Sequence, residues 1–167
     1  MSESLLPAIL VDKAREVVAA NRAAGRTVAV AESCTGGLVC AAITEISGSS
    51  DVFETGYITY SNASKVAALH IHRDVVDTFG AVSVATAWAM ARGALEASGA
   101  DVAVAITGIA GPDGGTVQKP VGTVVFARAI KGADDDIVAD QKLFDASDGR
   151  SGVRLQAALC ALELLMP

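Results

Sequence analysis

Apolar and polar residues follow two different spacings along this chain, and together they predict helices and strands that alternate. Between residues 5 and 20, apolar residues recur every three or four positions, which is the spacing of a helix. Residues 27–31 form a short run of β-branched residues and alanine, typical of a buried strand. A second helix is predicted over 38–46, where a Ser-Gly-Ser-Ser sequence ends it, and a second strand over 52–60.

The same spacings continue through the second half of the chain. The remaining predicted elements are helices over 62–69, 83–99 and 151–165 and strands over 101–107, 121–130 and 137–144. The last two strands are close enough in sequence to form a hairpin, whereas the earlier strands alternate with helices and are expected to be parallel. We therefore predict a single α/β domain over residues 1–167, with three α/β/α layers and a mixed, mostly parallel sheet.

Composition narrows the function classes. Hydrophobic residues make up 51% of the chain but aromatic residues only 4%, so the core has to be built from Ala, Val, Ile and Leu. The net charge of −6, with no cluster of basic residues, argues against nucleic acid as a partner.

The sequence has no apolar run of the ~20 residues that span a membrane, and its first residues lack the basic segment of a signal peptide. We therefore expect a cytoplasmic protein without membrane contact. The three cysteines have no metal-binding spacing, and we expect them to be reduced.

The sequence Ala-Glu-Ser-Cys-Thr-Gly-Gly at residues 31–37 joins the first predicted strand to a helix. This arrangement places the Ser33 hydroxyl on the turn and predicts that backbone N–H groups near Thr35, Gly36 and Gly37 can bind an anion or a developing oxyanion. The sequence is neither a P-loop nor a G-x-S-x-G elbow. An ordinary helix cap is the alternative, because Ser and Thr are favoured at that position.

A second segment, Tyr-Ser-Asn-Ala-Ser-Lys at residues 60–65, joins the next strand to the next helix. If Ser61 or Asn62 caps this helix, Lys65 lies about one turn inside it, near the same edge of the sheet as Tyr60. A lysine can act as a general base only if burial lowers its pKa by several units. The alternative is a lysine that faces solvent on a short helix.

A glycine- and proline-rich loop over residues 108–120 is too long to be a plain connection. Thr107 precedes it at the end of a buried strand, where α/β folds usually bind ligands, and Gly108 and Gly111 would allow a ligand to approach the backbone closely. Arg150 and Arg154 lie four residues apart at the start of the last helix, where they could bind a phosphate or simply face solvent.

Other arrangements of reactive residues have less support. His70 and His72 have no spaced third ligand, and nothing in the sequence places either of them near Cys34 to form a Cys–His pair. The acidic run Asp134–Asp136 is interpreted as a solvated turn rather than a metal site. No metal and no cofactor are predicted.

Taken together, these segments resemble the CinA C-terminal-domain family, the nicotinamide-nucleotide amidases. The resemblance covers roughly residues 5 to 165, in order and with close spacing. Its motifs are Ala-Glu-Ser-Cys-Thr-Gly-Gly (31–37), Tyr-Ser-Asn-x-x-Lys (60–65), Gly-Ala-Val-Ser (80–83), Thr-Gly-Ile-Ala-Gly-Pro-x-Gly-Gly-Thr (107–116) and Lys-Pro-Val-Gly (119–122). Two segments depart from the family pattern: the stretch before Arg150 is longer than the usual Gly-Asp-Arg, and His70 stands where members tend to have glycine.

The resemblance implies hydrolysis of the carboxamide of nicotinamide mononucleotide to nicotinate mononucleotide and ammonia, without a metal. It also implies that Ser33 is the nucleophile and Lys65 its base, with Tyr60 assisting, and that Arg150 binds the phosphate. Two alternatives remain at this point: a non-catalytic nucleotide-binding module, and a Ser–Lys hydrolase of another small amide or ester. We expect the partner to be a small nucleotide and the protein to form a homo-oligomer.

Overall fold

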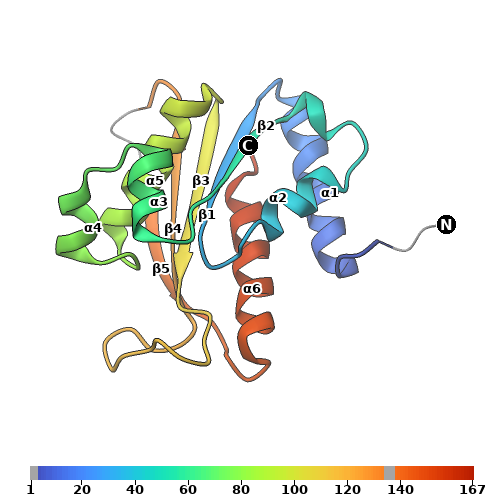
Figure 1. The fold of residues 1–167 in the computed structure, drawn as a ribbon. Helices are drawn as coiled ribbons and strands as arrows, with labels where there is room; N and C mark the ends of the chain where they lie inside the picture. The colour runs from blue at the N-terminus through green and yellow to red at the C-terminus, as the bar shows by residue number, and fades with distance from the viewer. Residues whose placement is uncertain (1–3, 134–137) are drawn as a thin grey trace.

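A five-stranded sheet forms the centre of the protein in the computed structural model, which describes residues 4–133 and 138–167 (Figure 1). The strands are β1 (Val28–Glu32), β2 (Phe53–Ile58), β3 (Val102–Gly108), β4 (Thr123–Ile130) and β5 (Val138–Leu143). Their spatial order is β2-β1-β3-β4-β5. β1 pairs in parallel with both β2 and β3, whereas β4 pairs antiparallel with β3 and with β5. The predicted mixed sheet with a late hairpin is confirmed, although only half of its strand pairs are parallel. The acidic turn expected at Asp134–Asp136 lies outside the described residues.

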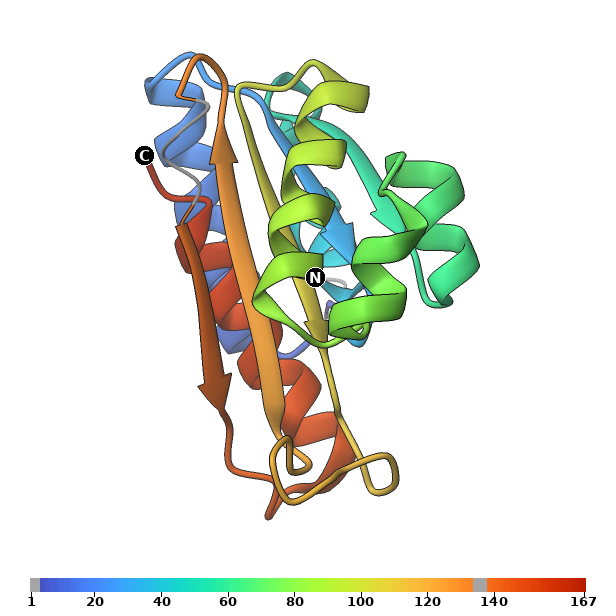
Figure 2. The ribbon, with the colours of Figure 1, turned by 90° about the vertical axis from the view of Figure 1, so that its left-hand side faces the viewer.

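Helices cover both faces of the sheet, which confirms the three-layer architecture (Figure 1). The first layer contains α1 (Ala8–Ala23), α2 (Leu38–Thr44) and α6 (Gly149–Leu164), and the second contains α3 (Asn62–Leu69), α4 (Arg73–Phe79) and α5 (Val84–Ser98). Figure 2 views the second layer from outside, with α5 against the strands and α3 and α4 to one side. No helix within the two described ranges is long and apolar enough to cross a membrane.

Two short elements were not predicted, the 3-10 turn Ser49–Asp51 and helix α4. α4 has seven residues and buries only Val76, so it leaves no periodic apolar pattern. The His72 side chain caps it by accepting a hydrogen bond from the Asp74 backbone N–H, a role that histidine rarely signals in a sequence. α1 begins at Ala8, three residues later than predicted, because Pro7 at the N-cap has no backbone N–H and disfavours a helical conformation in the residue before it.

The two faces of the sheet carry side chains of different size. Val and Ile from β1 and β3 point toward the layer of α1, α2 and α6, and alanines from the same strands point toward α5. Since successive residues of a strand point to opposite faces, the alternation of Val and Ala in these strands produces this difference directly. The short alanine side chains allow α5 to pack closely on the sheet, which matches the expectation of a core poor in aromatic residues.

Close packing also joins α5 to the end of α3. A Cβ atom added to Gly93 would lie well inside contact distance of the Leu69 carbonyl oxygen, so this α5 position accepts no side chain. Gly93 and Leu69 are both fully or almost fully buried. The position of α3, which carries Lys65, therefore depends on a glycine in the neighbouring helix.

We predict that Gly93→Ala destabilises the protein by about 1–3 kcal/mol, because the new methyl group forces α3 and α5 apart. Urea unfolding followed by circular dichroism measures the change. If the methyl group had room, alanine would instead stabilise this helix by up to about 1 kcal/mol, so a gain in stability would contradict the close contact.

Candidate active site

A cavity of about 160 Å³ lies where β1, β2 and β3 end, the edge at which α/β sheets usually bind ligands. It is lined by Ser33, Cys34, Tyr60, Asn62, Lys65, Ala81, Val82, Thr107, Gly108, Ala110 and Arg150. Six of the residues singled out from the sequence are therefore brought together here: Ser33, Tyr60, Lys65, Thr107, Gly108 and Arg150.

Ser33 and Lys65 form the centre of the cavity. Lys65 Nζ lies 3.0 Å from Ser33 Oγ and donates a second hydrogen bond of 2.8 Å to the carbonyl oxygen of Thr59. The Lys65 side chain is 1% exposed and Ser33 8%. Burial lowers the pKa of Lys65 below its ordinary value because an ammonium loses hydration when it is removed from solvent. The alternative of a solvent-facing lysine is thus excluded.

The local sequence explains why Lys65 points inward. Ser61 and Ser64 form a capping box, in which each side chain accepts a hydrogen bond from the backbone N–H of the other. This cap fixes the first turn of α3 and places Lys65 and Leu69, four residues apart, on the buried face of the helix.

The turn after Ser33 is held by a buried carboxylate. Glu32 accepts hydrogen bonds from the backbone N–H groups of Gly37 (3.0 Å), Val39 (3.2 Å) and Cys40 (2.9 Å). Glu32 is fully buried, and its charge lies at the positive end of α2. An internal residue therefore occupies the helix N-terminus that the sequence suggested for a ligand.

The three other residues expected to bind substrate on this turn do not line the cavity. The Gly36 N–H donates to the Ser33 carbonyl oxygen at 3.0 Å, and the Gly37 N–H is bound to Glu32. Thr35 is fully buried. Ser33 thus lines the cavity, whereas Thr35, Gly36 and Gly37 do not.

The two arginines of α6 have separate partners. Arg150 donates to the Tyr60 hydroxyl at 2.6 Å and to the Gly111 carbonyl oxygen at 2.7 Å, so it links the end of β2 with the glycine-rich loop across the cavity. Arg154 donates instead to the carbonyl oxygens of Cys34 (3.1 Å) and Thr35 (3.0 Å). Only Arg150 lines the cavity, so the expected arginine pair does not form one site.

The connection between α4 and α5 forms another part of the cavity wall. The Thr107 hydroxyl donates to the Ala81 carbonyl oxygen at 2.8 Å, and Lys119 Nζ donates to that of Val82 at 2.6 Å. The sequence had signalled this connection only through the motif at residues 80–83, without a role. Asn62, which the sequence indicated only as a helix cap, also lines the cavity.

Four basic side chains in or near this site have no carboxylate partner. Lys65, Lys119, Arg150 and Arg154 donate to carbonyl and hydroxyl oxygens, and none of them takes part in an ion pair among the described residues. Of these four, Arg150 lines the cavity and Lys119 contacts its wall at Val82, so these two cations favour an anionic ligand.

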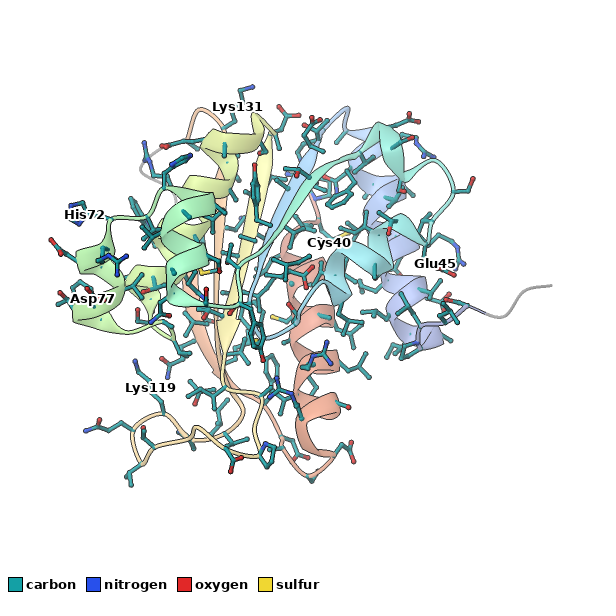
Figure 3. All side chains as sticks on the ribbon, in the orientation of Figure 1. Cys40, Glu45, His72, Asp77, Lys119 and Lys131 are labelled. Carbon is teal, nitrogen blue, oxygen red and sulfur yellow. The ribbon has the colours of Figure 1, made fainter. Side chains whose placement is uncertain are left out.

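The alternative nucleophile, Cys34, is poorly suited to the task. Its burial raises the pKa of the thiol to about 11, so the reactive thiolate is scarce at neutral pH. Neither histidine lines the cavity, and His72 lies exposed on the outer side of the second layer (Figure 3). The structure does not bring a Cys–His pair together.

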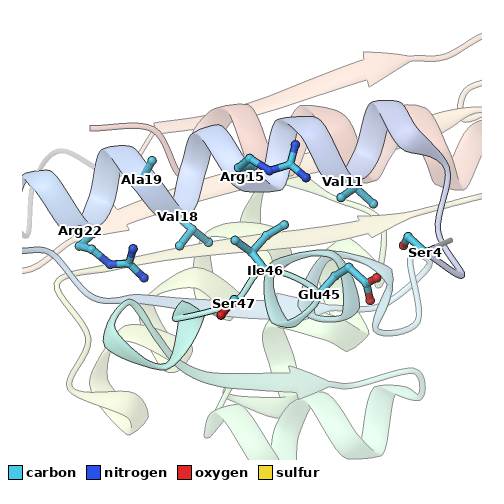
Figure 4. A pocket seen from close by; sticks show the side chains of 9 residues that line it. All are labelled: Ser4, Val11, Arg15, Val18, Ala19, Arg22, Glu45, Ile46 and Ser47. Carbon is cyan, nitrogen blue, oxygen red and sulfur yellow. The ribbon is translucent and has the colours of Figure 1, made fainter. Parts of the chain in front are cut away.

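A larger hollow of about 630 Å³ lies on the other side of the sheet, between α1 and the end of α2 (Figure 4). Ser4 and Ser47 are on its wall, but the nine residues that line it include no lysine or histidine that could activate them. The described residues also contain no group of three or more His, Cys, Asp or Glu side chains placed to bind a metal. The cavity at Ser33 and Lys65 is therefore the better candidate for chemistry.

This chain is similar to known proteins over most of its length. Residues 11–167 match the family described as "CinA C-terminal domain". The chain is 49% identical to the "Nicotinamide-nucleotide amidohydrolase PncC" of Enterobacter agglomerans, over 89% of this chain and 88% of that protein. It is 46% identical to the protein of the same name from Escherichia coli (strain K12), over 93% of this chain and 92% of that protein.

Longer relatives and a solved structure extend the comparison. A "Putative competence-damage inducible protein" of Symbiobacterium thermophilum is 51% identical over 84% of this chain, which corresponds to only 34% of that protein. The solved structure of "competence/damage inducible protein CihA from Agrobacterium tumefaciens" superimposes with a TM-score of 0.92 at 42% identity, covering 98% of this chain and 97% of that one.

Proposed function

This chain belongs to the CinA C-terminal domain family, and from that premise we propose that it hydrolyses the carboxamide of nicotinamide mononucleotide to nicotinate mononucleotide and ammonia. The observation that carries the proposal is the buried Lys65–Ser33 contact in a cavity that Arg150 also lines. The names of the relatives from Enterobacter agglomerans and Escherichia coli support the same reaction, since this chain covers about nine tenths of each.

The proposed reaction begins with the Ser33 hydroxyl. The neutral amine of Lys65 takes its proton while Ser33 Oγ forms a bond to the carboxamide carbon, whose electrophilicity the pyridinium ring increases. The tetrahedral intermediate collapses as its C–N bond breaks, and the nitrogen leaves as ammonia with the proton that Lys65 returns. Water then hydrolyses the acyl-enzyme ester by the same proton relay and frees Ser33.

The other cavity residues fit a mononucleotide. The Tyr60 oxygen accepts a hydrogen bond from Arg150, so its own proton is left to donate toward the substrate. Gly108 lines the cavity and has no room for a Cβ atom beside Val124 and Thr123, so its backbone is what faces the substrate. Arg150 and Lys119 are the cations that we propose for the phosphate. The homo-oligomer and the cytoplasmic location stay predictions from the sequence.

We predict that wild-type protein releases ammonia from nicotinamide mononucleotide and that Ser33→Ala lowers this rate by several orders of magnitude, because the nucleophile is lost. A coupled ammonia assay with and without a chelator gives the rates, and Cys34→Ala is the matched control that keeps most of the activity. Binding without turnover by the wild type would indicate the non-catalytic module instead. Turnover of other amides alone would indicate a different Ser–Lys hydrolase.

The pH dependence follows from the lowered pKa of Lys65. Because only the neutral amine accepts a proton, kcat/KM should rise with pH through an ionisation below that of a solvated lysine, ~10.4. Lys65→Arg should be nearly inactive at every pH, since a guanidinium stays protonated. An active Lys65→Arg enzyme would mean that Lys65 only stabilises charge, and Tyr60 would become the first candidate for the base.

The phosphate should supply much of the substrate's binding energy. We predict that free nicotinamide has a far lower kcat/KM than its mononucleotide, and that Arg150→Ala and Lys119→Ala raise KM for the mononucleotide by about tenfold or more, as expected for the loss of a charge-assisted hydrogen bond. Steady-state kinetics with both substrates provides the measurement. Equal kcat/KM values for the two substrates would remove the phosphate site, and an unchanged KM in both variants would place it elsewhere.

A further inference from the structure

Two opposite charges contact the turn that follows Ser33. The Glu32 carboxylate binds three backbone N–H groups at the start of α2, and the Arg154 guanidinium binds the carbonyl oxygens of Cys34 and Thr35. The two residues lie 122 positions apart in sequence, as their numbers show, in β1 and α6 respectively. The reaction proposed above assigns a role to neither.

These contacts determine how the turn is oriented. In a planar trans peptide, C=O and N–H point in opposite directions, so two carbonyl groups directed at Arg154 fix the peptide planes on both sides of Thr35. The Ser33 N–H donates to the Ile106 carbonyl oxygen at 3.0 Å, and the Ser33 carbonyl oxygen accepts from Gly36. The backbone of Ser33 is thus hydrogen-bonded to β3 on one side and to its own turn on the other.

The space around the guanidinium matches this role. A Cβ atom on Gly36 would lie 3.5 Å from Arg154 Nη2, and Gly36 has a φ of +59°, so the turn folds directly onto the arginine. Arg154 also lines an open groove with Leu38 and Leu155, and it is not among the residues that line the cavity. Arg154 therefore contacts the turn after Ser33 without lining the cavity.

We propose that Arg154 is a positioning residue that, together with Glu32, holds the Ser33 turn in the geometry for attack, and that it does not bind the substrate's phosphate. This inference rests on the proposed role of Ser33 as the nucleophile. A displacement of about 1 Å in a reacting group can cost a hundredfold in rate, so a small relaxation of this turn is enough to affect catalysis.

The first test separates positioning from binding. Arg154→Ala should lower kcat for nicotinamide mononucleotide by about a hundredfold with little change in KM, whereas the matched variant Arg150→Ala, one helical turn earlier, should mainly raise KM. Because the groove beside Arg154 is open, guanidinium ion at concentrations far below those that unfold proteins should restore part of the kcat of Arg154→Ala. The same ion should not restore Glu32→Gln, in which an amide replaces the carboxylate that accepts from α2.

A second measurement does not depend on the substrate. A fluorophosphonate probe, from which Ser33 Oγ displaces fluoride, should label wild-type Ser33 rapidly and Arg154→Ala slowly, with the rate recovering in guanidinium. Mass mapping of the labelled peptide gives the site. If the probe shows this pattern but wild-type protein releases no ammonia from the mononucleotide, the inference stands and the proposed substrate is wrong.

Three results would overturn the inference. They are an Arg154→Ala enzyme with normal kcat and normal labelling, an Arg154→Ala enzyme with a raised KM and unchanged kcat, and wild-type protein whose Ser33 does not react with the probe. The second of these would assign Arg154 to the phosphate.

Discussion

The contact between the Lys65 amine and the Ser33 hydroxyl is the interaction on which the rest of the site depends. An ammonium at this depth, with no carboxylate partner among the described residues, is costly, and burial shifts the equilibrium toward the neutral amine by lowering the pKa of Lys65. The same burial that would destabilise a charged lysine prepares an uncharged one to accept a proton. This state persists only while α3 stays packed against α5, because a shift of α3 would admit water to the amine.

Positioning and binding are carried out by different charges around this contact. Glu32 uses the N–H groups at the start of α2 that a ligand might otherwise have bound, so the helix terminus stabilises the protein's own turn. Arg150 and Lys119 hydrogen-bond to carbonyl and hydroxyl oxygens, which are weaker partners than a phosphate would be. A site arranged in this way can bind an anion without disturbing the residues that hold the nucleophile.

The sequence predicted the parts of the structure that depend on local patterns. The Val–Ala strands, the capped helix of Lys65 and the positions of Ser33 and Thr107 at strand ends could all be read from neighbouring residues. Contacts between distant segments could not: Arg150 and Tyr60 are 90 residues apart, and the Arg154 contact spans about 120. The spacing of the two arginines suggested one shared anion, but spacing cannot show that Arg150 has its partners across the cavity while Arg154 has them on the turn after Ser33. Glu32 escaped notice for a similar reason, since the hydrogen bonds of a buried carboxylate appear only in three dimensions.

The difference in size between the two faces of the sheet has a consequence for how this protein can evolve. The alanines of β1 and β3 and the bare position at Gly93 carry no functional group, yet they set the thickness of the layer that brings α3, and with it Lys65, to the sheet. Larger residues on that face would move Lys65 away from Ser33 without changing either side chain. On the valine face, side chains of similar volume can replace one another with less effect. Homologous domains could therefore lose activity through substitutions of these small residues, even though every reactive side chain is still present in the sequence.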